Sequence, residues 1–312
     1  MAEPDITDVH AIRVDRPDGL VAARVAFLAT LYFRDPGNSE KRGHVGAAAA
    51  QFLQQFGHAI RWLKPLQNAK AIAVPGLIPG DLAAQFAQTD PRDELSFYAH
   101  SGETARDAGL VMTDVFAPLD APFPQLGHIS VSVGIGMLSE TGSSSLRTII
   151  GQLCETVRPF HGYAGLGLVR CPNPYPAREA EPYLINLARE FPGLLIDMPI
   201  SYAQQLEAGI LGVNWQTVLG PEMVAKFGDQ KKLIAAAADA GLETSEHGAA
   251  VLIQAGPAPV VGGPEGSVPE AYRRASALVK GLRASFDSVI IESDIEGLDR
   301  RAFTRSWLNR FD

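Results

Sequence analysis

The chain has 312 residues, of which 46% are hydrophobic, and it carries 27 Lys and Arg against 35 Asp and Glu, for a net charge of −8. A chain of this length and composition can bury a large core by itself, so we expect a globular protein. The acidic balance argues against a protein that binds DNA or RNA regardless of sequence, because such binding relies on Lys and Arg. It suits a basic protein partner instead.

The cysteines and the N-terminal residues of the chain indicate its cellular compartment. Cys154 and Cys171 are too few for a disulfide framework or a cysteine-rich zinc site, which favours a reducing environment. The first residues are acidic and lack the basic flank of a signal peptide. The apolar run Leu20–Phe33 contains Arg24 and is shorter than the roughly 20 residues that cross a bilayer. We therefore expect a cytoplasmic protein that does not interact with membranes.

The first third of the chain alternates predicted strands and helices. Val21–Phe33 is rich in Val, Leu and Phe and ends in a turn cluster at Asp35, which predicts a buried strand. Apolar residues recur every four positions from His44 to Leu63 and predict a long helix. Extended character resumes at Leu95–Ala99 and at Gly109–Phe116.

A strand, a helix and a second strand follow. Gly127–Leu138 alternates apolar with small or polar residues, the period of a half-buried strand. The hydroxyl-rich segment Thr141–Ser145 can cap a helix whose apolar positions continue to Val157. Tyr163–Val169 is again strand-like. Together these segments predict a β-α-β unit from Gly127 to Arg170.

The second half repeats this arrangement. A helix over Ala177–Phe191 precedes a second predicted unit from Leu211 to Ala255. Two further helices are indicated by a capping-box pair, Ser267 and Glu270, and by a C-terminal stripe of apolar residues that reaches Phe311. We predict an α+β fold, with mixed or antiparallel sheet layers, two β-α-β units and helices packed on the sheet face. We expect residues 1–312 to form one domain.

Motifs for common chemistry are missing or incomplete. No P-loop string occurs, and the pairs Gly134–Gly136 and Gly165–Gly167 lack the third glycine of a dinucleotide fingerprint. No Gly-x-Ser-x-Gly elbow occurs, and no two of the seven histidines have metal-ligand spacing on a helix. Cys171, before Pro172, is expected to be more exposed than Cys154. We predict no catalytic residue, no cofactor and no metal site.

Five carboxylates gather near the C-terminus: Asp287, Glu292, Asp294, Glu296 and Asp299. They can be a solvated connection whose acids favour the N-terminus of the next helix. They can also be an electronegative patch that attracts a cationic partner and accelerates association.

Several strings resemble a known family. Arg189–Gly193, Leu195–Asp197 and Gly212–Gly220, followed by Lys226–Gly228, resemble the TsiV-like immunity proteins of type VI secretion, and His161–Gly165 fits the same family. The resemblance implies a non-catalytic protein that binds a cognate effector toxin, possibly a nuclease, and protects the producing cell. Trp215 is then expected in the core, with Asn214 bonding backbone groups, and the five carboxylates are the candidate toxin contacts.

Two other classes of protein remain open. A hydrolase or small-molecule enzyme could assemble a site from His128, His161, Asp197 and Glu292, and a pocket with convergent titratable groups would favour it. A structural subunit of the secretion machinery is the third possibility, but the sequence has no repeat or coiled-coil signal. The oligomeric state does not follow from the sequence.

Overall fold

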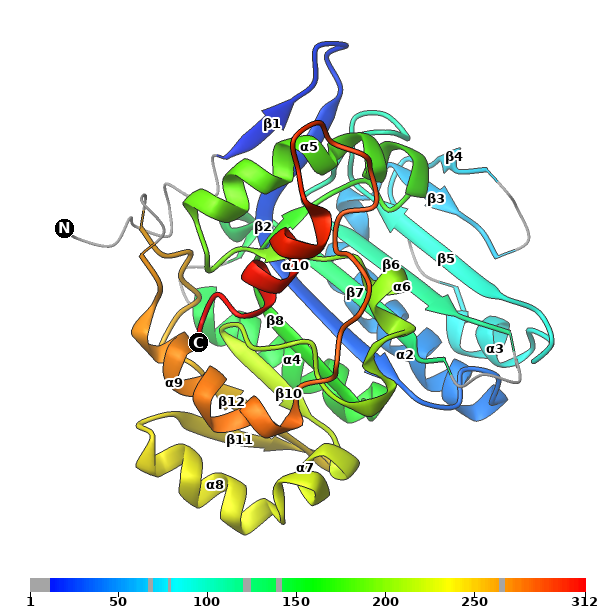
Figure 1. Ribbon diagram of the computed structural model, residues 1–312. Coiled ribbons are helices and arrows are strands. Elements are labelled where there is room, and N and C mark those ends of the chain that lie inside the picture. Colours follow the sequence, from blue (N-terminus) through cyan, green and yellow to red (C-terminus); the bar gives the residue numbers. More distant parts are fainter. Residues whose placement is uncertain (1–11, 67–69, 78–79, 120–124, 139–141, 264–266) are drawn as a thin grey trace.

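The computed structural model describes residues 12–66, 70–77, 80–119, 125–138, 142–263 and 267–312. Within these residues twelve strands form one sheet in the order β11-β12-β10-β8-β2-β7-β6-β5-β3-β4, with β1 paired to β2 and β9 to β8 (Figure 1). Of the described pairs, only β8 and β9 run parallel. The strands are β1 (Arg13–Asp15), β2 (Val21–Phe33), β3 (Trp62–Lys64), β4 (Ile72–Ala73), β5 (Leu95–His100), β6 (Met112–Ala117), β7 (Gly127–Val133), β8 (His161–Val169), β9 (Leu195–Ile196), β10 (Gln216–Leu219), β11 (Glu243–His247) and β12 (Ala250–Gln254).

Strand β2 occupies the middle of the sheet. It pairs with β7 along one side and with β8 along the other, so that Tyr32 lies between His128 and His161. Almost every β2 residue is buried, because helices cover the sheet on both sides. This explains its continuous apolar sequence, which differs from the alternation typical of a strand with one wet face.

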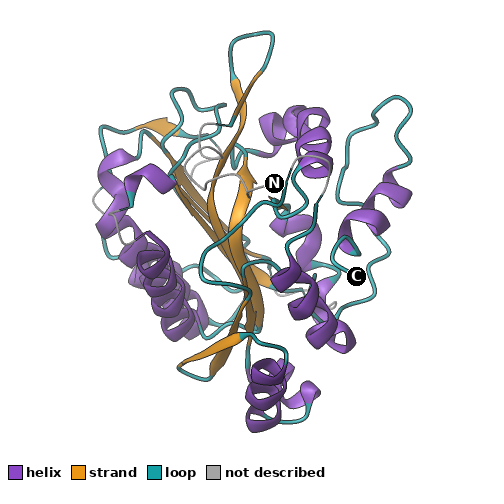
Figure 2. Ribbon diagram, turned by 90° about the vertical axis from the view of Figure 1, so that its left-hand side faces the viewer, coloured by secondary structure: helices purple, strands orange, loops and turns teal. Residues whose placement is uncertain are grey.

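Two helical layers enclose the sheet (Figure 2). One face is covered by α2 (Ser39–Phe56), α3 (Leu82–Ala87) and α4 (Gly142–Val157), and the other by α5 (Pro174–Glu190), α6 (Pro199–Ala203), α9 (Glu270–Val279) and α10 (Arg300–Leu308). Helices α7 (Pro221–Phe227) and α8 (Gln230–Asp239) lie near the β11–β12 end of the sheet (Figure 1). The predicted α+β class is confirmed, but helices cover both faces of the sheet and not one face as expected.

The first predicted β-α-β unit is present, and the second differs. Strands β7 and β8 are both antiparallel to β2 and therefore parallel to each other, with α4 between them in sequence. After β10 and the helices α7 and α8, the chain forms the hairpin β11–β12, and β12 returns antiparallel to β10. Because β11 reads Glu-Thr-Ser-Glu-His, it has no apolar alternation by which the sequence would predict a strand.

Some predicted boundaries need correction. Helix α2 ends at Phe56 instead of Leu63, because the chain tightens into a 3-10 turn at Gly57 and then enters β3. A Cβ on Gly57 would lie 2.1 Å from the carbonyl oxygen of Leu77, so glycine is required there. The predicted capping box of α9 is wrong, since the N-cap is Pro269 and the Ser267 hydroxyl instead accepts from the backbone of Gly263. The predicted cap residue Thr141 lies outside the described residues.

The strings that resemble the immunity family meet in the core. Asn214 donates from Nδ2 to the carbonyl oxygen of Gly193 at 2.8 Å, and its Oδ1 accepts from the backbone N–H of Trp215 at 2.8 Å. Trp215 is completely buried and packs edge-on against Phe27, with ring centroids 6.1 Å apart. The expected roles of Asn214 and Trp215 are therefore confirmed.

In the described part of the chain, none of the helices is long and apolar enough to span a bilayer.

Candidate functional site

A row of polar side chains crosses the sheet face that α5 and α6 cover. In the strand register, Asp114 of β6 lies opposite Ser130 of β7, Ser130 lies opposite Thr30 of β2, and Thr30 lies opposite Tyr163 of β8. The hydroxyl oxygens of Ser130 and Thr30 are 2.7 Å apart and hydrogen-bonded. Because Thr30, Ser130 and Tyr163 are buried, their hydroxyls need partners within the protein.

Asp197 supplies the main acceptor for this row. It lies between β9 and α6, where Oδ2 accepts from the Thr30 hydroxyl at 2.6 Å and Oδ1 accepts from the Tyr163 hydroxyl at 2.5 Å. Burial raises the pKa of Asp197, and the two hydrogen bonds oppose this shift. The carboxylate is therefore held by neutral donors.

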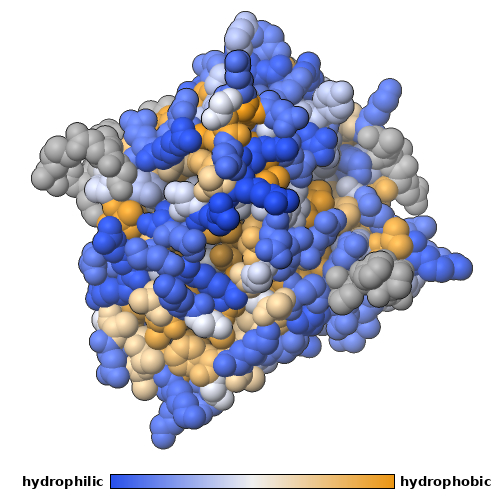
Figure 3. All heavy atoms as spheres, viewed as in Figure 1, coloured by the Kyte–Doolittle hydropathy of each residue, from blue (hydrophilic) through white to orange (hydrophobic). Residues whose placement is uncertain are grey.

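A cavity of about 320 Å³ lies between the polar row, α5 and α6. Its lining joins sheet residues to the first turn of α5, to the segment from Asp197 to Ser201 and to Glu292 of the C-terminal loop. The lining includes Leu28, Met112, Asp114 and Ser130 from the sheet, Pro174 and Ala177 from α5, and Met198 and Ile200 beside α6. Ile200 is 40% exposed, so the cavity reaches the surface. Figure 3 shows apolar surface in the hollows between polar side chains on this face of the molecule.

Two arginines at the cavity are already engaged. Arg170 donates to the carbonyl oxygens of Ala177 at 3.1 Å and Asp197 at 2.6 Å, and lies 3.9 Å from the buried carboxylate of Glu181. Arg178 lies 2.7 Å from the carboxylate of Glu292 in an ion pair. Glu292 also accepts from the hydroxyl of Ser201 at 2.5 Å.

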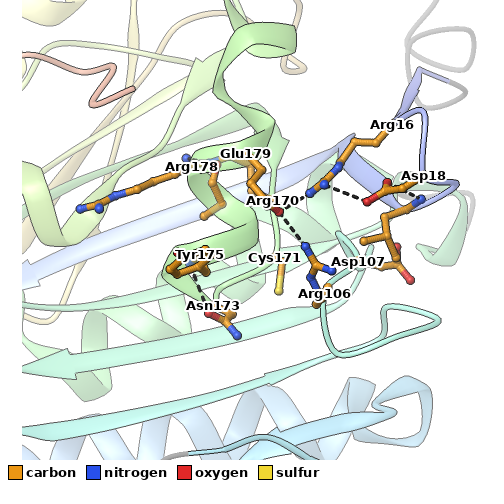
Figure 4. A network of polar contacts seen from close by, with 12 residues as sticks. Arg16, Asp18, Arg106, Asp107, Arg170, Cys171, Asn173, Tyr175, Arg178 and Glu179 are labelled. Carbon is orange, nitrogen blue, oxygen red and sulfur yellow. Dashed lines mark hydrogen bonds and ion pairs between the residues drawn. The ribbon is translucent and has the colours of Figure 1, made fainter. Parts of the chain in front are cut away.

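Ion pairs with two neighbouring segments hold helix α5, which forms one wall of the cavity, in place. Glu179 lies between Arg16 of the β1–β2 hairpin and Arg106 of the loop before β6, and it pairs with both (Figure 4). Asn173 caps the helix by accepting from the backbone N–H of Tyr175 at 3.2 Å. These contacts hold the first turn of α5 over the sheet.

A model of one protein family matches residues 44–311, and that family is TsiV, described as type VI immunity for VRR-NUC. The chain belongs to the TsiV family. Among solved structures, the Pseudomonas aeruginosa T6SS protein PA0821 is similar over 97% of this chain and 88% of that chain, with a TM-score of 0.84 and 22% identity. At this identity the similarity concerns the fold. A comparison with curated proteins finds no match.

The TsiV chain brings together only part of the dispersed enzyme site considered from the sequence. Asp197 and Glu292 line the same cavity, whereas His128 and His161 are buried and are not among its lining residues. His128 Nε2 lies 3.2 Å from Oδ2 of Asp114. His161 donates from Nε2 to the carbonyl oxygen of Leu206 at 3.2 Å, and burial lowers its pKa to about 3.

The five candidate toxin contacts lie on the loop before α10 and at its start. Asp287, Asp294 and Glu296 are exposed. Asp294 pairs with Arg300 at 3.1 Å, and Asp299 is the N-cap of α10, accepting from the backbone N–H of Ala302 at 2.9 Å. Glu292 is set back in the cavity wall. The predicted patch thus includes Glu292 in the cavity wall and Asp299 as a helix cap, whereas Asp287, Asp294 and Glu296 have neither role.

Cys171 was expected to be more exposed than Cys154, and both residues are in fact buried. Cys171 is 3% exposed, donates from Sγ to the carbonyl oxygen of Ala105, and has its pKa raised to about 12 by burial. It is therefore a thiol at neutral pH.

Among the described residues, no three His, Cys, Asp or Glu side chains converge in a way that could hold a metal ion.

Sequence reasoning missed several cavity residues: Asp114, Arg170, Arg178 and Ser201. Asp114 interrupts an otherwise apolar strand, and Arg170 follows nine buried residues of β8. A charged residue in or directly after a buried strand can indicate a polar site, because a buried charge needs an oppositely charged partner, hydrogen bonds or contact with water.

Proposed function

We propose that this TsiV chain is an immunity protein that binds its cognate type VI effector, a toxin with a VRR-NUC nuclease domain, and neutralises it in a tight stoichiometric complex. The family match over residues 44–311 carries the proposal. The producing cell would be protected without any reaction catalysed by the chain.

The charge of the chain supports a nuclease as partner. Its net charge is −8, and Asp287, Asp294 and Glu296 are exposed on one loop. A nuclease binds the phosphates of its substrate with basic side chains, so an acidic inhibitor is attracted to the same surface. The chain would act in the cytoplasm, where a nuclease meets nucleic acid.

A hydrolase is the second candidate function, because Asp197 and Glu292 line one cavity. Three observations weigh against it. Both oxygens of Asp197 already accept hydroxyl hydrogen bonds, Glu292 is paired with Arg178, and Cys171 is protonated at neutral pH. None of these groups is a free base beside a free nucleophile.

Co-expression tests the immunity function. Cells that express the cognate toxin should grow when this chain is produced and should die when an unrelated acidic protein of equal abundance replaces it. Failure of the intact, well-expressed chain to restore growth would contradict the proposal.

A titration separates binding from catalysis. Nuclease activity of the purified toxin should fall linearly with added chain and vanish near one equivalent. Complete, time-dependent inactivation by a trace of the chain would instead indicate an enzyme.

A further inference from the structure

We propose that the cavity between α5, α6 and the sheet takes one basic side chain, arginine or lysine, of the effector; this inference rests on the proposed function. Of the five carboxylates on the loop before α10, Glu292 lines this cavity, and the exposed Asp287, Asp294 and Glu296 do not. The cavity would stabilise the bound complex, whereas the exposed carboxylates of the loop would increase the rate of association.

The charges at the cavity favour a cation. Arg170 is engaged with Glu181 and backbone carbonyls, and Arg178 with Glu292, so these charges balance within the protein. The remaining lining carboxylates are Asp114 and Asp197. Asp114 has one hydrogen-bond partner among the described residues, His128, and Asp197 is bonded by neutral hydroxyls. Arg170 already acts on Asp197 by its charge, whereas the carboxylate of Asp114, 15% exposed, is the one that a guanidinium or ammonium group of a partner can reach and pair with.

The walls fit the stem of such a side chain. The lining combines the apolar side chains of Leu28, Met112, Met198 and Ile200 with the carboxylates of Asp114 and Asp197. Arginine and lysine combine an aliphatic stem with a charged end, and thus match both surfaces. The volume of about 320 Å³ is large enough for one long side chain.

The surroundings resemble a protein interface. Tyr175, in the first turn of α5 beside the lining residue Pro174, is 78% exposed, and Ile200 on the cavity wall is 40% exposed. Exposed tyrosine and arginine near a pocket are typical of interface hot spots. The contacts of Glu179 with Arg16 and Arg106 keep this wall in place before binding, which reduces the entropy lost on association.

Two variants test the cavity by different routes. Ala177→Trp fills it, with Asn186→Trp at an exposed position of the same helix as control. Asp114→Asn removes a carboxylate from the lining, with the exposed Asp239→Asn as control for the change in net charge. Binding to the purified nuclease domain of the cognate effector is measured by calorimetry, and folding by circular dichroism.

We expect Ala177→Trp and Asp114→Asn to weaken binding at least about tenfold, with both controls within about twofold of the parent. Replacing each Arg and Lys of the effector by Ala should reveal one residue whose loss weakens binding to the parent but not to Ala177→Trp.

Unchanged affinity of a folded Ala177→Trp chain would overturn the inference and leave the proposed function intact. Absence of binding by the parent chain would overturn both. If the parent releases a small organic cation on denaturation while Ala177→Trp does not, and both bind the effector equally, the cavity is a small-molecule site and the inference is wrong.

Discussion

The hydroxyl of Thr30 donates a 2.6 Å hydrogen bond to Asp197, 167 residues further along the chain. Asp197 ends one of the strings shared with the immunity family, and Thr30 lies in the central strand of the sheet. This bond, together with that from Tyr163, ties the connection between β9 and α6 to the sheet and thereby positions one wall of the cavity.

Replacing Asp197 by Ala should destabilise the protein by about 2 kcal/mol, because two hydrogen bonds to a buried carboxylate are lost and part of its desolvation cost is recovered. Urea unfolding followed by fluorescence measures the change. The exposed Asp287→Ala is the control and should stay within about 0.5 kcal/mol of the parent. Equal free energies of unfolding for the two variants would show that the hydrogen bonds from Thr30 and Tyr163 to Asp197 do not stabilise the protein.

Acidification should destabilise the protein through His161. Burial lowers its folded-state pKa to about 3, whereas an unfolded histidine titrates near about 6.5. Between these values the unfolded chain binds the proton and the folded chain does not, so stability is complete above pH ~6.5 and falls as the pH drops, at up to about 1.4 kcal/mol per pH unit.

The variant His161→Phe should have a shallower loss of unfolding free energy between pH 6 and 4.5 than the parent. Urea unfolding at several pH values measures this slope, with the exposed His58→Phe as control. Identical slopes for the parent and His161→Phe would mean that His161 takes up its proton in the folded state.

The exposed carboxylates should accelerate association with a basic toxin. Because Glu292 lines the cavity and Asp299 caps α10, we select the other three, Asp287, Asp294 and Glu296, for replacement by their amides. Stopped-flow association at low salt should slow about two- to tenfold, and its salt dependence should weaken. The same change in net charge at exposed Glu190, Asp239 and Glu246 is the control. Equal rates for the two triple variants would remove the loop from the contact surface.

Trp215→Ala should cost about 3 to 5 kcal/mol, since it removes a fully buried indole and leaves a cavity. It also removes the 3.0 Å hydrogen bond from the indole nitrogen to the carbonyl oxygen of Gly256. Thermal and urea unfolding measure the loss, with Tyr175→Ala, at a 78% exposed side chain, as control. A loss below about 0.5 kcal/mol would be incompatible with a structural role for Trp215.

The sequence predicts elements with strong periodicity and misses those without it. Val21–Phe33 and the unit from Gly127 to Arg170 are recognised because apolar spacing changes from one element to the next. The incomplete fingerprint at Gly165 has a packing reason, since a Cβ there would lie 1.7 Å from Oδ1 of Asn214. That the chain forms one domain stays a prediction.

The cavity could not be predicted in this way. Asp114, Arg178 and Glu292 come from a strand, a helix and a loop that are adjacent only after the sheet and α5 have formed. No spacing in the sequence relates them. The resemblance to the family indicates Asp197 through its string, but not the hydroxyl groups that it binds.

The central position of β2 affects how the protein is made. Val21–Phe33 is synthesised before its main partners, β7 and β8, which begin at Gly127 and His161. Until then β1 can pair only with the start of this strand, up to Arg24, and the rest has two open edges, a template for pairing with other chains. Pairing between residues so distant in sequence also slows folding. A newly synthesised chain therefore reaches its folded state only after these distant strands have formed, so the amount of folded protein lags behind synthesis.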